Sequence, residues 1–136
     1  MRKRILSLIF IVAFSFLNIV GCSHAQSEKQ ASYQTISSET AKKRLESEKG
    51  IVLLDVRTSE ENLEKRIPGS ILIPVNDIKN QASEKLKDKN AAIYVYCRSG
   101  NRSAVASQEL ANLGYINVFN LGGINNWPYE TESVKQ

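Results

Sequence analysis

The chain has 136 residues, which is room for one domain of ordinary size and not for two. It carries 18 Lys and Arg against 14 Asp and Glu, but three of the basic residues lie within the first four positions. The other 15 nearly balance the acidic residues, so the net charge of +4 supports no nucleic-acid partner.

Residues 1–21 have the composition of an export signal. The basic head Arg2–Arg4 is followed by an almost wholly apolar run, ILSLIFIVAFSFLNIVG, and this order is typical of a secretory signal. The run has 17 residues, three of them polar, and falls short of the roughly 20 residues that span a bilayer comfortably. We therefore expect a signal peptide, and an exported protein, instead of a membrane-spanning helix.

The end of this run, residues 19–22 (IVGC), resembles a bacterial lipobox. In that motif the cysteine is lipidated on its thiol and becomes the first residue of the mature protein. The resemblance implies a lipoprotein anchored through Cys22 to a bacterial membrane in the cell envelope. The alternative is ordinary cleavage nearby, after the segment that ends in Ala25.

Residues 22–32 are small and polar and show no periodicity, which predicts a flexible tether. The only histidine of the chain, His24, lies in this segment, and we interpret it as part of the linker. One domain is expected over residues 33–130. Residues 131–136 are expected to form a disordered tail.

Strand-like and helix-like segments alternate through this domain. Ser37 or Ser38 can cap the first helix, and Gly50 can end it. Continuous apolar runs such as residues 51–56 are typical of buried parallel strands. The alternation predicts an α/β domain with a largely parallel sheet. The expected strands are residues 33–36, 51–56, 70–74, 92–97 and 116–121, and the expected helices are residues 37–49, 59–64, 76–90 and 103–112, the last with Ala104, Val105, Leu110 and Ala111 buried.

The loop between the strand at residues 92–97 and the helix at residues 103–112 has the sequence CRSGNRS. In open α/β sheets, binding sites form at this edge of the sheet. Backbone N–H groups that turn inward before a helix N-terminus form an anion-binding nest. Gly100 permits a positive φ or a close approach of backbones, and Arg98 and Arg102 add positive charge. The loop is therefore a candidate anion site.

Cys97 begins this loop and is the only other cysteine besides Cys22. N–H dipoles and guanidinium groups stabilise a thiolate and lower its pKa, and the thiolate is the nucleophile. Because the domain contains no histidine, activation has to come from residues 98–103. The alternative is an inert buried cysteine at a strand end, but such a cysteine needs no polar loop. We interpret Cys97 as catalytic.

The loop resembles the active-site loop of the rhodanese family, whose cysteine accepts a sulfane sulfur and holds it as a persulfide. Three further segments resemble family markers in the same order: residues 54–57 (LDVR), residues 67–70 (IPGS), and residues 121–124 (LGGI) with Trp127. The resemblance spans roughly residues 33–128. Arg66 stands where the family often has histidine before the Ile-Pro-Gly turn.

The resemblance implies a rhodanese-like α/β fold, with a central, largely parallel sheet flanked by helices on both faces. It implies a sulfurtransferase in which the Cys97 thiolate takes a sulfane sulfur from thiosulfate or a persulfide donor. A thiol, which can belong to a protein, or cyanide then accepts that sulfur. The donor and the persulfide would be held by Arg98, Ser99, Gly100, Asn101, Arg102 and Ser103.

Asp55 and Arg57 follow a core strand, and we expect them to support the structure as an ion pair. Trp127 is interpreted as a core residue. We expect a monomer with no cofactor. We expect no metal either, because two cysteines, one of them lipidated, cannot build a metal site.

Two other functions are compatible with parts of this pattern. A cysteine-based phosphatase or arsenate reductase also places a thiolate in a loop with arginine, but that class has five residues between the two. Here only four residues separate Cys97 from Arg102. A rhodanese-like module that only binds a partner is the second alternative, although such modules commonly lack the cysteine.

Overall fold

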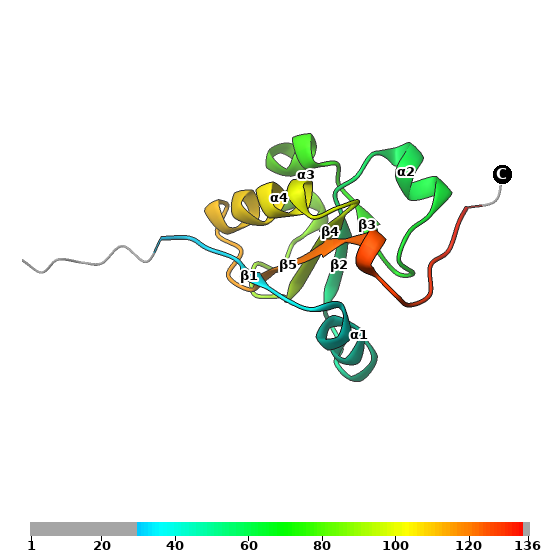
Figure 1. Ribbon diagram of the computed structural model, residues 1–136. Coiled ribbons are helices and arrows are strands. Elements are labelled where there is room, and N and C mark those ends of the chain that lie inside the picture. Colours follow the sequence, from blue (N-terminus) through cyan, green and yellow to red (C-terminus); the bar gives the residue numbers. More distant parts are fainter. Residues whose placement is uncertain (1–29, 135–136) are drawn as a thin grey trace, which may run out of the picture.

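The computed structural model describes residues 30–134. Five strands form one all-parallel sheet in the order β1-β5-β4-β2-β3, and helices cover both of its faces (Figure 1). The expected fold class is therefore confirmed. The elements are β1 (Gln34–Thr35), α1 (Ser38–Ser47), β2 (Val52–Asp55), α2 (Ser59–Glu64), β3 (Ile71–Leu72), the 3₁₀ turn η1 (Val75–Asp77), α3 (Ile78–Lys85), β4 (Ile93–Cys97), α4 (Asn101–Asn112), β5 (Val118–Gly123) and the 3₁₀ turn η2 (Ile124–Asn126).

The expected signal peptide and Cys22 lie outside the described residues. Within residues 30–134, no helix has the length and apolar character needed to cross a membrane.

The central strand β4 is buried on both faces, and its side chains alternate between two apolar clusters. Val95 and Cys97 face the cluster that α3 and α4 cover, whereas Tyr94 and Tyr96 face the cluster that α1 covers. In Figure 1, α3 and α4 lie on one side of the sheet and α1 lies on the other. A strand covered on both sides must be apolar throughout, which explains the continuous apolar sequence of residues 92–97.

The helix ends follow from local side-chain chemistry. Ser37 caps α1 by accepting a hydrogen bond from the backbone N–H of Thr40 at 3.2 Å. Thr58 and Glu61 form a reciprocal capping box at the start of α2. The short helix at residues 59–64 thus begins and ends where we expected it.

The helix after the cysteine loop begins two residues earlier than predicted, and its expected buried face is confirmed at Leu110 and Ala111 but not at Val105. Gly100, at φ +110, precedes its first residue Asn101. The residues that face the core are Ser103, Ala106, Ser107, Leu110 and Ala111. The prediction of Val105 as buried was wrong, since 64% of its surface is exposed, and Ala104 is only partly buried. Small polar residues, Ser103 and Ser107, occupy core positions here, so the apolar pattern alone located only part of the buried face.

The segment after residue 130, expected to be a disordered tail, is ordered through residue 134. Arg66 and Glu132 pair as an antiparallel bridge, with N–O distances of 2.8 and 2.9 Å. The backbone N–H of Val134 also donates to the carbonyl of Leu63 at 2.9 Å. Because both partners lie about 70 residues earlier in the chain, local composition carried no signal of this pairing.

Strand β5 brings two glycines alongside the cysteine. A shift in register between Val95 and Tyr96 places Gly122 opposite Tyr96 and Gly123 opposite Cys97. Cys97 is the last residue of β4, so the end of β5 and the loop after β4 lie against each other at the carboxyl edge of the sheet. That edge is where α/β folds form their sites.

Candidate active site

The sulfur of Cys97 lies at the end of β4, beneath the loop that leads into α4. Its side chain is fully buried. The backbone N–H of Gly100 donates a hydrogen bond to the Cys97 Sγ atom at 3.0 Å, and the Ser103 Oγ atom lies 3.5 Å from the same sulfur. The loop therefore turns polar hydrogens toward the sulfur, as an anion-binding nest does.

These contacts control the ionisation of the thiol. Burial acts to raise the pKa of Cys97, because it disfavours the charged form. Hydrogen bonds from the Ser103 hydroxyl and from the backbone N–H groups of Ser103, Gly100 and Ser99 act in the opposite direction. The net result is a lowered pKa. Cys97 is thus a thiol whose thiolate is stabilised by the loop.

The loop can take this shape because β5 ends in two glycines. A Cβ atom at Gly123 would lie 2.3 Å from the carbonyl oxygen of Arg98 and 2.7 Å from the Cα of Ser99. The same Arg98 carbonyl accepts a hydrogen bond from the backbone N–H of Asn125 at 3.2 Å. Gly123 therefore leaves the space that the cysteine loop occupies, which its sequence resemblance to a family marker did not reveal.

The positive charge of Arg102 is paired with a carboxylate. Its guanidinium donates two hydrogen bonds to the carboxylate of Glu61, at 2.7 and 2.8 Å. Glu61 belongs to α2, and we did not single it out from the sequence. The T-x-x-E pattern of Thr58 and Glu61 signals a capping box, but nothing local signals a partner 41 residues away.

The side chains of the remaining loop residues are turned outward. Arg98, Ser99 and Asn101 are exposed, and Ser103 is buried beside Cys97. The structure therefore brings the backbone N–H groups and Ser103 to the sulfur, and it leaves Arg98 as the loop's solvent-facing cation.

A shallow pocket of about 260 Å³ adjoins the loop. Charged residues of both signs line most of it: Arg57, Glu61, Glu64, Lys65 and Arg98, together with Ile124 and Asn125. Arg98 directly follows Cys97 in the chain, but Cys97 itself does not line this pocket.

Asp55 and Arg57 form the buried ion pair that we expected. Arg57 Nη2 lies 2.7 Å from Asp55 Oδ2, and Arg57 also donates its Nε–H to Asp55 Oδ1 at 2.9 Å. The same carboxylate accepts hydrogen bonds from Asn62 Nδ2 at 2.9 Å and from the Tyr96 hydroxyl at 3.0 Å. This network ties β2, α2 and β4 together next to the site, so its role is structural support.

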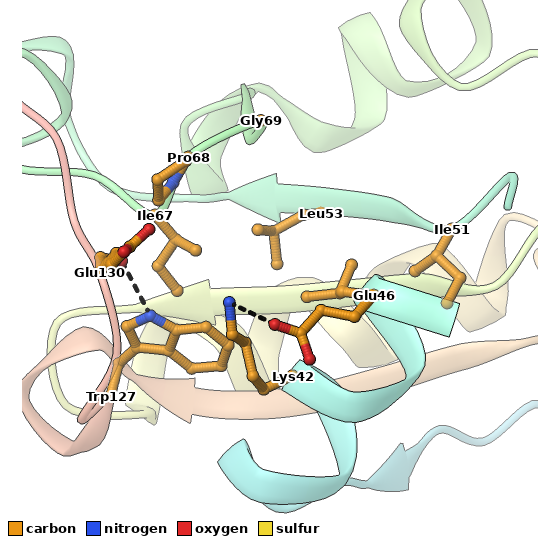
Figure 2. Close-up of a pocket in the computed structure, with 10 residues that line it drawn as sticks. Lys42, Glu46, Ile51, Leu53, Ile67, Pro68, Gly69, Trp127 and Glu130 are labelled. Atoms are coloured by element: carbon orange, nitrogen blue, oxygen red, sulfur yellow. Dashed lines mark hydrogen bonds and ion pairs between the residues drawn. The ribbon is translucent and has the colours of Figure 1, made fainter. Parts of the chain in front are cut away.

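A second pocket of about 260 Å³ lies by α1, and none of residues 97–103 lines it. Figure 2 shows Trp127 and Leu53 among its lining residues, together with the Lys42–Glu46 ion pair. The two charges are 2.9 Å apart, and the Trp127 Nε1–H donates to the carbonyl of Glu130 at 3.2 Å. Trp127 is buried, as expected of a core residue.

Comparison with known proteins places this arrangement in context. A family model described as "Rhodanese-like domain" matches residues 37–130. The putative sulfur carrier protein YrkF of Bacillus subtilis is 35% identical over 107 residues, covering 78% of this chain and 57% of YrkF. This chain thus spans little more than half the length of that relative. The thiosulfate sulfurtransferase PspE of Escherichia coli is 35% identical over 71 residues, which is 52% of this chain and 68% of PspE.

Solved structures of rhodanese-like proteins resemble this fold. A rhodanese-like domain protein from Staphylococcus aureus superimposes with a TM-score of 0.66 at 32% identity, covering 76% of this chain and 99% of the other.

Proposed function

The chain belongs to the rhodanese-like family of sulfurtransferases, and we propose that it transfers a sulfane sulfur from thiosulfate or a persulfide donor to a thiol through a persulfide on Cys97. One observation carries this proposal: the buried Sγ atom of Cys97 accepts a hydrogen bond from the Gly100 N–H at the start of α4. A sulfur held in this way is suited to bear negative charge and to attack.

The first step loads the enzyme. The Cys97 thiolate attacks the outer sulfur of thiosulfate and forms a new S–S bond. The bond between that sulfur and the sulfite group breaks, and sulfite leaves with the electron pair. The product is a Cys97 persulfide, whose terminal sulfur carries the negative charge toward the N–H groups of the loop.

The second step transfers the sulfur from the Cys97 persulfide to an acceptor. An acceptor thiolate, or cyanide in an assay, attacks the terminal sulfur and takes it away. The electron pair of the broken S–S bond returns to Cys97 as a thiolate, so the enzyme is regenerated. No external acid or base is required in either step, which is consistent with a site that contains no histidine.

The pocket beside the loop supports an anionic donor. Lys65 and Arg98 are exposed and line it, so they provide cationic groups for thiosulfate as it approaches. The name of the relative PspE supports thiosulfate as the donor. Arg102, held by Glu61, contributes to the fixed shape of the loop instead of closing over the anion.

We also propose, from residues 1–22 alone, that the chain is exported and anchored through a lipid on Cys22. Metabolic labelling of the expressing bacterium with a radioactive fatty acid tests this. Label is expected in the wild-type protein and not in the Cys22→Ser variant, and equal labelling of both would refute the anchor.

The experiment for sulfur transfer uses the full chain carrying Cys22→Ser, so that Cys97 is its only thiol. The protein is incubated with thiosulfate, and its intact mass is measured before and after cyanide is added. We expect the mass of one additional sulfur atom, removed by cyanide with formation of thiocyanate. The matched control adds Cys97→Ser and should show no change. Absence of the adduct in the Cys22→Ser chain, or its presence in the control, would refute the mechanism.

A further inference from the structure

The buried hydroxyl of Ser103 stands among several acceptors but has one proton to donate. Its Oγ atom lies 2.7 Å from Asn120 Oδ1, 2.9 Å from the Gly100 carbonyl oxygen and 3.2 Å from the Gly122 carbonyl oxygen. The Cys97 Sγ atom is farther away, at 3.5 Å. The shortest of these contacts is to Asn120, so the resting hydroxyl donates there and receives the S–H of Cys97.

The orientation of the Asn120 side chain follows from a second contact. The backbone N–H of Gly122 donates to Asn120 Oδ1 at 2.9 Å. The oxygen of the amide, and not its NH₂ group, therefore faces Ser103. Asn120 can only accept a hydrogen bond at this point, which makes it a competitor for the Ser103 proton.

Ionisation of Cys97 changes what the hydroxyl must do. A thiolate cannot donate, and it is stabilised when Ser103 turns its proton toward the sulfur. That rotation breaks the 2.7 Å hydrogen bond to Asn120. We propose that Asn120 is a positioning residue, which competes with the Cys97 thiolate for the Ser103 proton and so sets the pH at which the nucleophile forms. This inference rests on the proposed function, in which that thiolate attacks the donor.

The charged groups around the sulfur are separate from this contact. They are Arg98 in the loop, Arg102 on α4 with its partner Glu61 from α2, and the ion pair between Arg57 and Asp55, the last residue of β2. Strand β5, which carries Asn120, contains no charged residue. Replacement of Asn120 by a neutral residue thus leaves every charge near the sulfur in place.

The test measures the ionisation of Cys97 without any sulfur donor. In the full chain carrying Cys22→Ser, the rate of alkylation by iodoacetamide is followed against pH. Asn120→Ala is expected to move this profile to lower pH, with about fivefold more thiolate below the midpoint, the equivalent of one net hydrogen bond. Ser103→Ala is expected to move it to higher pH.

The double variant decides the mechanism. If Asn120 acts through Ser103, Asn120→Ala has no effect on the profile once Ser103→Ala is present. An unchanged profile in the single variant, or the same displacement in both backgrounds, would overturn the proposal.

A second substitution tests the proposal with less disturbance of the fold. Asn120→Asp keeps an oxygen that can accept hydrogen bonds from both the Gly122 N–H and the Ser103 hydroxyl. Asn120→Asp is expected to move the alkylation profile of Cys97 to higher pH. The displacement should be larger in the chain that retains Ser103 than in the chain carrying Ser103→Ala, and equal displacements would contradict the proposal. Alkylation and sulfur loading are separate readouts. A chain that shows the expected profiles but takes no sulfur from thiosulfate would refute the proposed function and support the role of Asn120.

Discussion

The carboxylate of Glu61 holds the guanidinium of Arg102 with two hydrogen bonds, at 2.7 and 2.8 Å. Glu61 also accepts from the backbone N–H of Thr58 at 3.0 Å, so one side chain both caps α2 and connects it to the first turn of α4. Both partners are only partly exposed. The pair therefore braces the cysteine loop from the side opposite β5.

This pair makes the free energy of unfolding depend on pH. The Arg102 guanidinium lowers the pKa of Glu61 to about 2, from an ordinary value of 4.5. A carboxyl with a lowered folded-state pKa contributes stability that is complete above the ordinary value and disappears as the pH falls through the lowered one. Glu61→Gln should cost about 1–2 kcal/mol at neutral pH and nothing below pH about 2.

Urea unfolding of both proteins across this pH range measures the difference. Glu46→Gln is the control, because its ion pair with Lys42 lies on the surface of α1 and should contribute little to stability. A constant gap between the wild type and Glu61→Gln from neutral pH to pH about 2 would contradict the assignment.

Removal of the Asp55 carboxylate should be far more costly. Asp55 is fully buried and is the common acceptor for Arg57, Asn62 and Tyr96. Asp55→Ala leaves a buried guanidinium without its counter-charge, which costs about 3–5 kcal/mol. Chemical denaturation measures this loss. Glu48→Ala, which breaks an exposed ion pair with Arg44 at the end of α1, should have a much smaller effect in the same assay.

A methyl group at Gly123 should damage the site directly. Its Cβ atom would overlap the backbone of Arg98 and Ser99, so the cysteine loop has to move. Gly123→Ala is expected to reduce the rate of sulfur loading from thiosulfate by at least about tenfold, equivalent to 1.4 kcal/mol. Gly69→Ala is the control: its φ is +79, but no atom lies within 4 Å of the added carbon. That variant should lose about 1–2 kcal/mol of stability and keep its loading rate. Equal rates in the two variants would show that the close approach at Gly123 has no functional role.

The buried face of α4 can be tested with two substitutions on one helix. Leu110 is fully buried, and Val105 is 64% exposed. Leu110→Ala should lower the free energy of unfolding by about 2–5 kcal/mol, whereas Val105→Ala should change it by no more than about 0.5 kcal/mol. Thermal or urea unfolding distinguishes the two, and a large effect at Val105 would contradict the orientation of the helix.

Several features of the fold could be predicted because they depend on short, local stretches of sequence. The apolar run of residues 92–97 is typical of a strand covered on both faces. The helix at residues 59–64 was also predicted, and the capping box of Thr58 and Glu61 explains why it begins there. The full set of α4 side chains that face the core could not be predicted in this way. Leu110 and Ala111 are buried as predicted, but Ser103 and Ser107 also occupy buried positions, and an apolar pattern does not include serine.

Some features of the site depend on contacts between distant residues and were not predicted. Arg102 could be recognised as a loop residue, but its partner Glu61 lies 41 positions earlier. Asn120 lies opposite Val95 in the pairing of β5 with β4, and its contact with Ser103 joins residues 17 positions apart. Arg66 and Glu132 pair across 66 positions, which is why the C-terminal segment was expected to be disordered.

By itself the sequence indicated Cys97 as the candidate nucleophile and predicted its surroundings along the chain. Cys97, the polar loop after it and the alternation of strands and helices are local patterns, set by which residues can adopt a strand, a turn or a helix start. The tertiary structure alone decided how that nucleophile is controlled. Arg102 is neutralised by Glu61, the Ser103 proton is shared with Asn120, and Gly123 admits the loop. These are properties of the distances between strands and helices, and such distances exist only once the sheet has formed.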